Sequence, residues 1–111
     1  MNITLFIEKL NASGIIFQET LDVIESNYNF APTEFSNGNI TNKAGENSGS
    51  CKLFAFAKAQ NLSKEETLKC FGEHYQNVLD TPKGDSHQNI RNFMIFGWEG
   101  VSFTGTALVK K

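Results

Sequence analysis

The sequence predicts an α+β fold that is mostly helical, with about five helices and a small antiparallel sheet of two or three short strands. Two observations carry this prediction. Apolar residues recur every three or four positions through most of the chain, while an Asn-Gly dipeptide and a run of alternating residues near the C-terminus indicate strands. A chain of 111 residues, of which 40% are hydrophobic, is long enough to bury a core. We expect residues 1–111 to form a single compact domain.

The first two helices are predicted at residues 2–12 and at about 18–29. In the first helix, Asn2 is a suitable N-cap, and Ser13-Gly14 marks the end. The second helix should stop at Asn29 through Pro32, because the residue before a proline avoids the helical conformation.

The middle of the chain combines a hairpin with a buried helix. Asn37-Gly38 stands between two short β-capable runs in residues 33–42, which is a typical hairpin turn. A polar loop follows at residues 43–50. The run that begins at Cys51 and ends near Gln60 is apolar around most of its circumference, so we expect it to form the central helix.

Two further helices are predicted in the C-terminal half. Ser63 and Glu66 form a capping box, and the helix that they start should run to about residue 80. A fifth helix should start with Asp85 as its N-cap and with Gln88 at the third helical position, and Gly97 suits its C-cap.

The end of the chain contains a predicted strand. Val101, Phe103 and Gly105 alternate with polar residues, and this strand should pair with the segment near 33–41, because an isolated hairpin is only marginally stable. We expect the tail at 108–111 to be frayed.

Composition and charge exclude several classes of function. The 10 basic and 12 acidic residues leave a net charge of −2, which does not give the basic surface that nucleic-acid binding needs. No segment approaches the length needed to insert into a membrane. The first nine residues do not resemble a signal peptide, and two cysteines are too few for a disulfide scaffold. We expect free thiols in a reducing compartment, although a bridge between Cys51 and Cys70 is left open.

The first candidate site is the segment Asn47, Ser48, Gly49, Ser50 and Cys51, just at the start of the central helix. A helix N-terminus presents unpaired N–H groups and a partial positive charge, which favour an anion or a thiolate. The segment is therefore a candidate for ligand or anion binding. The alternative interpretation is structural: Cys51 is a small apolar residue on a buried helix, and the two serines cap that helix.

A thiol enzyme is the catalytic alternative. Cys51 would be its nucleophile, His87 its general base, and Asp85 the residue that orients His87. This hypothesis requires the sulfur of Cys51 to lie within hydrogen-bonding reach of His87. We expect a binding function rather than catalysis, because a single tetrapeptide is the only signal for catalysis.

The second candidate site is the segment from His87 to Trp98, in which His87, Asn89, Arg91 and Trp98 are candidate binding residues. Arg91 is the only arginine, and arginine binds carboxylate or phosphate with two parallel hydrogen bonds. Trp98 is able to stack against a ligand or a partner. The structural alternative is that Arg91 bonds to a carbonyl group and that Trp98 fills the core.

A metal site and a cofactor are not expected. Cys70 and His74 are four residues apart on one predicted helix, and Cys51 and His87 would complete a set of two cysteines and two histidines. Their spacing matches no recurrent zinc pattern, which pairs two cysteines close in sequence.

Several of these motifs together resemble the HopJ type III effector family. They are Asn47 through Ala57, Thr67-Leu68, Phe71-Gly72, His87 through Met94, Gly97-Trp98 and Phe103, and the similarity extends from about Phe17 to Leu108. The resemblance implies a small protein of Gram-negative bacteria. The family name implies virulence and delivery into a host cell by a type III secretion system. The resemblance implies no agreed reaction and no set of catalytic residues.

Three functions are therefore open. We expect first a small effector-like module, a monomer, that binds a host or bacterial protein or a small ligand through residues 47–51 and 87–98. Its expected location is the bacterial cytoplasm, with export through the type III system implied by the family. The alternatives are the thiol enzyme and a housekeeping protein without a catalytic site. The leading hypothesis requires the two segments to meet at one concave surface.

Overall fold

The computed structural model describes residues 2–111 and has the predicted α+β architecture. Six α-helices, one 3₁₀ helix and five short strands occur in this part of the chain, in the order α1(Ile3–Ala12), α2(Phe17–Asn27), β1(Tyr28–Phe30), β2(Phe35–Asn37), β3(Ile40–Asn42), α3(Ser48–Ala59), α4(Lys64–Lys69), α5(Glu73–Asp80), α6(Gln88–Phe96), η1(Gly97–Gly100), β4(Val101–Phe103) and β5(Leu108–Lys110).

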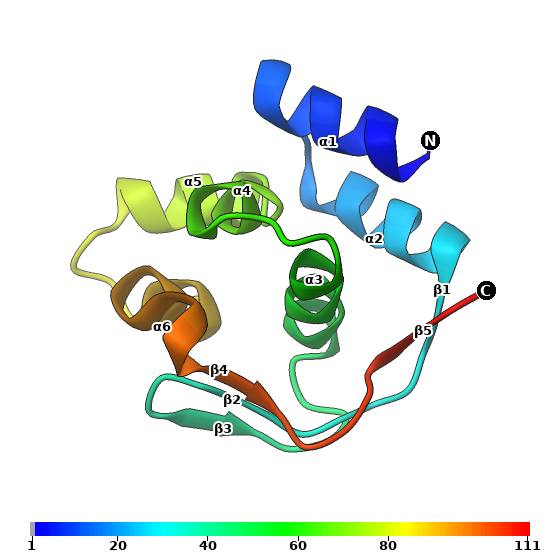
Figure 1. Ribbon diagram of the computed structural model, residues 1–111. Helices are drawn as coiled ribbons and strands as arrows, with labels where there is room; N and C mark the ends of the chain where they lie inside the picture. Colours follow the sequence, from blue (N-terminus) through cyan, green and yellow to red (C-terminus); the bar gives the residue numbers. More distant parts are fainter. Residues whose placement is uncertain (1) are drawn as a thin grey trace.

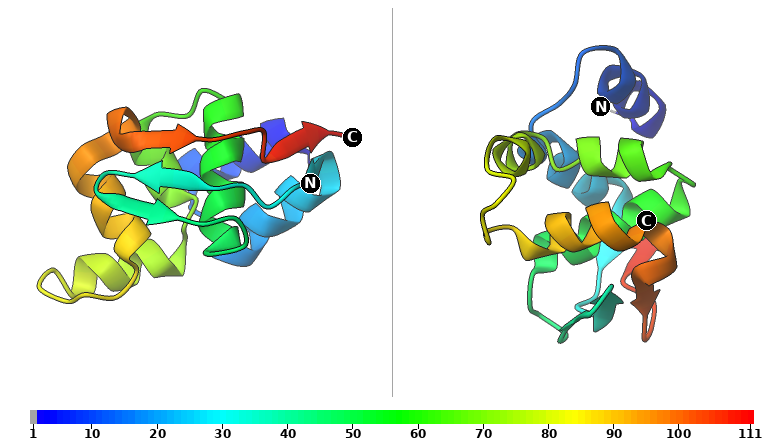
Figure 2. Two further views of the ribbon diagram at one scale, coloured as in Figure 1. Left: turned by 90° about the horizontal axis from the view of Figure 1, so that it is seen from below. Right: turned by 90° about the vertical axis from the view of Figure 1, so that its left-hand side faces the viewer.

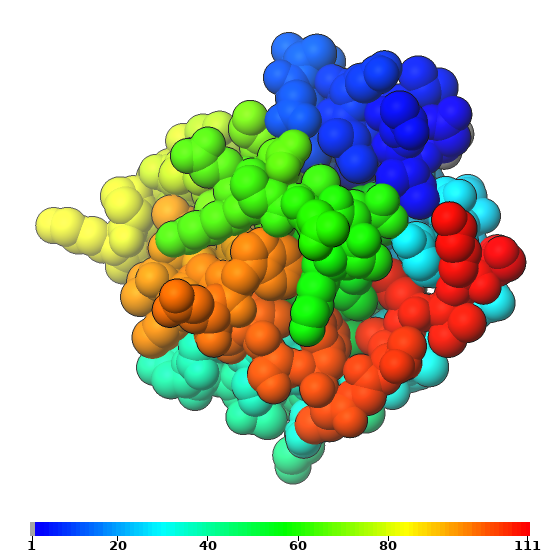
Figure 3. All heavy atoms as spheres, viewed as in Figure 1, coloured from blue at the N-terminus to red at the C-terminus, as the bar shows by residue number. Residues whose placement is uncertain are grey.

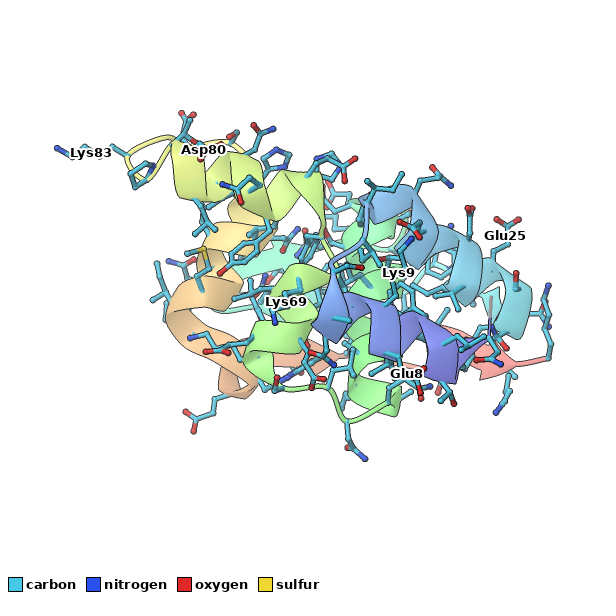
Figure 4. The ribbon with its side chains drawn as sticks, turned by 90° about the horizontal axis from the view of Figure 1, so that it is seen from above. Glu8, Lys9, Glu25, Lys69, Asp80 and Lys83 are labelled. Atoms are coloured by element: carbon cyan, nitrogen blue, oxygen red, sulfur yellow. The ribbon has the colours of Figure 1, made fainter. Side chains whose placement is uncertain are left out.

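The helices lie together on one side of the strands (Figures 1 and 2). Helix α3 is central, and the other helices surround it. Helix α1 rests on α2, where Lys9 Nζ lies 2.6 Å from Glu19 Oε2 (Figure 4). The loop between α5 and α6 projects from the body of the molecule, with Asp80 at the end of α5 and Lys83 near the tip of the loop (Figures 3 and 4).

The strands form two antiparallel sheets. One has the order β3-β2-β4, in which Phe35 pairs with both Asn42 and Phe103. This confirms that the C-terminal strand pairs with the segment that contains the hairpin. The other sheet pairs β1 with β5, which joins Tyr28 to Lys110.

The core is built on the aromatic residues of α3. Leu53, Phe54 and Phe56 are fully buried, as the apolar circumference of this helix predicts. The ring of Phe54 contacts four other aromatic rings, with centroid distances of 5.0 to 6.3 Å, and these rings belong to Phe35, Phe71, Phe93 and Trp98. The single helix thereby joins the sheet, the α4–α5 turn and α6 in one core.

The helix predicted from residue 64 to residue 80 is in fact two helices, which corrects the sequence prediction. The Ser63–Glu66 capping box is present, but α4 ends at Lys69 and α5 begins at Glu73. Gly72 between them has a φ angle of 57°, which is favourable only for glycine. The break lets the turn approach the start of α2: a Cβ atom at Gly72 would lie 2.6 Å from the backbone nitrogen of Phe17.

The expectation of a frayed tail is also wrong. Residues 108–110 form β5, and residues 28–30, predicted only as the end of a helix, form its partner β1. The backbone N–H of Lys111 also donates to the carbonyl of Asn27 at 3.0 Å. Pairing with a distant strand overrides the weak local preference of such short segments.

Three element boundaries differ from the prediction. The hairpin turn is Gly38-Asn39 rather than Asn37-Gly38, because the buried side chain of Asn37 belongs to the sheet. Helix α3 begins at Ser48, three residues before the predicted start at Cys51. Helix α6 begins after His87, not after Asp85, although Gly97 ends it as predicted.

We expect Gly72→Ala to destabilise the protein more than Gly14→Ala does. Both glycines have positive φ, so each substitution strains the backbone by about 1 kcal/mol. A Cβ atom at Gly14 meets nothing within 4 Å, whereas at Gly72 it overlaps the backbone of residues 15–17, which adds about 1–3 kcal/mol. Urea unfolding measures both free energies, and equal losses would contradict this account of the helix break.

Candidate functional site

A cavity of about 520 Å³ lies where the starts of α3 and α6 meet. Its walls come from the start of α2, strand β3, the beginning of α3, the α4–α5 turn with α5, and the beginning of α6. The lining residues are Phe17, Ile40, Asn42, Asn47, Gly49, Ser50, Phe71, His74, His87, Gln88, Asn89 and Ile90. Two segments about 40 residues apart in sequence therefore share one hollow, as the leading hypothesis requires.

Buried asparagine side chains hold these two helix starts against strand β3. Asn42 Oδ1 accepts hydrogen bonds from Asn47 Nδ2 at 2.7 Å and from Asn89 Nδ2 at 3.0 Å. Asn89 Oδ1 in turn accepts from Asn37 Nδ2 at 3.0 Å and from Asn42 Nδ2 at 3.2 Å. Asn42 is therefore the bridge between the N-cap of α3 and the first turn of α6.

Two imidazole rings face each other at the cavity. His74 comes from α5 and His87 precedes α6, and their ring centroids are 5.1 Å apart. The ring of Phe17 meets His74 edge-on at 5.0 Å. The start of α2 is fixed by Glu73, whose carboxylate accepts the N–H of Phe17 at 2.7 Å, and this bond lowers the pKa of Glu73.

The N-caps of α3 and α6 have an unusual backbone. Asn47 and His87 adopt left-handed conformations, with φ angles of 49° and 51°, and neither side chain caps its own helix. Within residues 2–111, the first-turn N–H groups of Gly49, Ser50, Gln88 and Asn89 donate to no protein acceptor. Both helices thus present free backbone donors where they border the cavity.

Cys51 lies in the core rather than on the cavity wall. Its side chain is 1% exposed, and its sulfur is 3.5 Å from the carbonyl oxygen of Thr33. Burial raises the pKa of the Cys51 thiol and raises that of Cys70 to about 12. Both thiols are free and both are buried, so the structure agrees with the structural interpretation of Cys51 and gives the thiol enzyme no support.

Several other predicted site residues have structural contacts. Arg91 donates to the carbonyl of Thr81 at 2.8 Å and to that of Ser86, so it holds the α5–α6 loop. The indole N–H of Trp98 donates to the carbonyl of Leu62 at 3.1 Å, and its ring packs on Phe93.

Ser48 and Asp85 also lie outside the cavity lining. The hydroxyl of Ser48 is 3.4 Å from the carbonyl of Gly45, and the carbonyl of Asp85 accepts from the side chain of Gln88. Asp85 therefore neither caps α6 nor contributes to the cavity wall.

The structure thus brings together Asn47, Gly49, Ser50, His87 and Asn89 from the predicted set. Sequence analysis did not identify Asn42 or the apolar wall, and it considered His74 only for a metal site. His74 and His87 are the only histidines of the chain, but their positions in the sequence give no signal that they meet. Asn42 carried no such signal, because its role depends on the tertiary pairing of β3 with the helices.

Within residues 2–111, no group of three or more His, Cys, Asp or Glu side chains is arranged to hold a metal ion. In the same range, no helix is both long enough and apolar enough to span a bilayer.

The fold defines a small α+β protein with a cavity lined by polar and apolar residues, and comparison with known proteins places the chain in a family. The model of the HopJ type III effector protein family matches residues 3–108. The chain therefore belongs to the HopJ type III effector family, which confirms the resemblance inferred from its motifs.

One solved structure is closely similar over the whole chain. It is described as the crystal structure of the unknown function protein VPA0580, and it shares 50% sequence identity with a TM-score of 0.97. The match covers 100% of this chain and 95% of that one. No curated protein matches the sequence.

We expect Asn42→Ala to lower the free energy of unfolding by about 1–3 kcal/mol, because it leaves the buried amide of Asn89 without its acceptor and removes the bond to the exposed Asn47. Asn77→Ala on the exposed face of α5 is the control, with a change within about 0.5 kcal/mol. Chemical denaturation measures both values. A loss at Asn42 no larger than at Asn77 would show that the amide bridge is not needed for stability.

Both thiols should resist modification in the folded protein. The raised pKa of each thiol reduces the thiolate fraction at any pH, and burial blocks the reagent. Ellman's reagent at pH 8 should react slowly with native protein and with both thiols after unfolding in guanidinium chloride. The Cys70→Ala variant assigns the signal, and rapid native reaction of Cys51 in that variant would revive the thiol-enzyme hypothesis.

Proposed function

We propose that the protein is a small ligand-binding module of the effector type, and that a small polar molecule occupies the cavity between α3 and α6. The observation that carries this proposal is the meeting of Asn47, Gly49 and Ser50 with His87 and Asn89 around one cavity of about 520 Å³. This volume lies within the range of small-molecule sites. The side chains and backbone groups there supply hydrogen-bond donors and acceptors against an apolar wall.

The backbone at the cavity supports the same proposal. Among residues 2–111, three residues other than glycine have positive φ, namely Asn47, Asn61 and His87, and two of them border this cavity. Such conformations cost free energy and cluster at functional sites. The hydrogen bonds of Asn42 to Asn47 and Asn89 hold the two segments that contain these conformations, and so keep the cavity preformed.

The position of Cys51 favours binding over thiol catalysis. Its sulfur packs beneath the first turn of α3, while His87 faces the cavity, so the proposed nucleophile and its base do not share a wall. A housekeeping protein without any site remains the competing hypothesis, and it differs from the proposal in predicting no saturable ligand.

We expect a fragment screen by ¹H–¹⁵N NMR to give binders that shift the amide signals of the lining residues. Gln88→Trp should abolish these shifts by filling the cavity, because Gln88 lines it and is exposed. Gln76→Trp, a matched change on the exposed surface of α5, should leave them intact. The proposal fails if no fragment shifts the lining amides, or if Gln88→Trp binds the fragments as well as Gln76→Trp does.

Delivery into a host is proposed from family membership. It implies a host partner or ligand for the exported protein. A fusion of residues 1–25 to a reporter enzyme should be exported by a bacterium with a working type III apparatus and retained by a mutant without one. Equal retention in both strains, with normal export of a known effector fusion, would contradict delivery by this route.

A further inference from the structure

We propose that the ligand of this cavity carries an anionic group, a carboxylate or a phosphate, which binds beside His74 and His87. This inference rests on the ligand-binding function proposed above and adds the chemical class of the ligand. It is carried by the pair of imidazoles, by the absence of Asp and Glu among the described lining residues, and by the apolar part of the lining.

The two imidazoles lie next to each other in the cavity lining. They come from different elements, and their rings are tilted by 37° at a centroid distance of 5.1 Å. In each charge state a histidine has at least one N–H donor, and protonation adds a second donor with a positive charge. This distance leaves no room for an atom between the rings, so an anion would accept hydrogen bonds at the ring edges.

The charged residues near the two imidazoles leave them able to bind an anion. None of the described residues that line the cavity is Asp or Glu. The nearby carboxylate of Glu73 accepts the N–H of Phe17 and lies outside the lining, although its pKa is lowered in part by the charge of His74. Among the described lining residues there is also no lysine or arginine, so the histidines are the lining side chains that can carry a positive charge.

The backbone adds donors to the same place. Helices α1 and α4 have side-chain caps, from Asn2 and Ser63, and the N–H of Phe17 in α2 is bound by Glu73. Helices α3, α5 and α6 have no side-chain cap, and α3 and α6 begin at the cavity. Their partial positive charges reinforce the preference of the imidazoles for an anion.

The apolar lining residues indicate the character of the rest of the ligand. Phe17, Phe71, Ile40 and Ile90 give the cavity an apolar side, and the cavity is much larger than one carboxylate or phosphate needs. The ligand is therefore an organic acid or phosphate ester with an apolar or aromatic body, rather than a free inorganic anion.

Titration by ¹H–¹⁵N NMR with benzoate, phenyl phosphate, benzamide and inorganic phosphate tests this inference. We expect benzoate or phenyl phosphate to bind at least about tenfold more tightly than benzamide, their neutral analogue, and to shift the amides of Gly49, Ser50, Gln88 and Asn89. Inorganic phosphate should bind more weakly than the aromatic anions. The stronger of the two aromatic anions identifies the charged group as carboxylate or phosphate.

Two variants locate the charge recognition. His74→Gln keeps a helical donor without a charge, and His87→Asn retains a residue that tolerates the left-handed backbone. Each should weaken the aromatic anion at least about fivefold and leave benzamide affinity unchanged, and Asn77→Ala should change neither. Amide chemical shifts outside the cavity that match the wild type verify the fold of each variant.

The outcomes separate the two proposals. Equal affinity for benzamide and the anions, or anion binding that is indifferent to both histidine variants, overturns the anionic inference and leaves ligand binding in place. No binding of either aromatic anion also overturns the inference. The ligand-binding function falls separately, through a fragment screen without any binder at the lining amides.

Discussion

The amide bridge at Asn42 is the constraint on which the cavity depends. One side-chain carbonyl oxygen accepts hydrogen bonds from Asn47, the N-cap of α3, and from Asn89 in the first turn of α6, which are 42 positions apart in the sequence. Amides buried away from water are costly unless they are paired, so this arrangement has few alternatives. Because Asn42 lies in β3, the position of both helix starts is set by the three-stranded sheet.

Aromatic packing in the core reinforces the amide bridge at Asn42. Phe54 of α3 packs on Phe93 of α6 at 5.0 Å and on Phe35 of β2 at 6.0 Å. Helices α3 and α6 are thus joined twice to the three-stranded sheet, by apolar contacts with β2 and by hydrogen bonds with β3. The core resists separation of α3 from α6, and the amides fix their rotation, which together give a rigid rim to the cavity.

The sequence allowed the parts of the fold that depend on local patterns to be predicted. The capping box at Ser63, the C-cap at Gly97 and the apolar circumference of α3 are all short-range signals, and each was confirmed. The pairing of β4 with the hairpin region was also predicted, because a lone hairpin lacks stability.

What sequence could not show depends on distant contacts. Gly72 looked compatible with a continuous helix, and only its approach to residues 15–17 reveals why the helix breaks. In the site, the segments around Asn47 and His87 were identified, but Arg91 and Cys51 were assigned equal weight with them. An arginine bound to loop carbonyls and a cysteine in the core have the same sequence signature as functional residues.

The pairing of β1 with β5 determines how the molecule responds to mechanical force. Residues 28–30 join the N-terminal helices to strand β2, and their partner is the last strand of the chain. Force applied to the N-terminus first pulls α1 and α2 away from the rest of the protein. It then acts on Tyr28, which is paired with Lys110 in the terminal pair of this ladder. The hydrogen bonds between β1 and β5 therefore break one after another, by unzipping, rather than all at once in shear. Removal of α2 already takes Phe17 out of the cavity wall, and once the short ladder has opened, the force acts on the sheet that carries Asn42, so the cavity is lost before α3 is extracted.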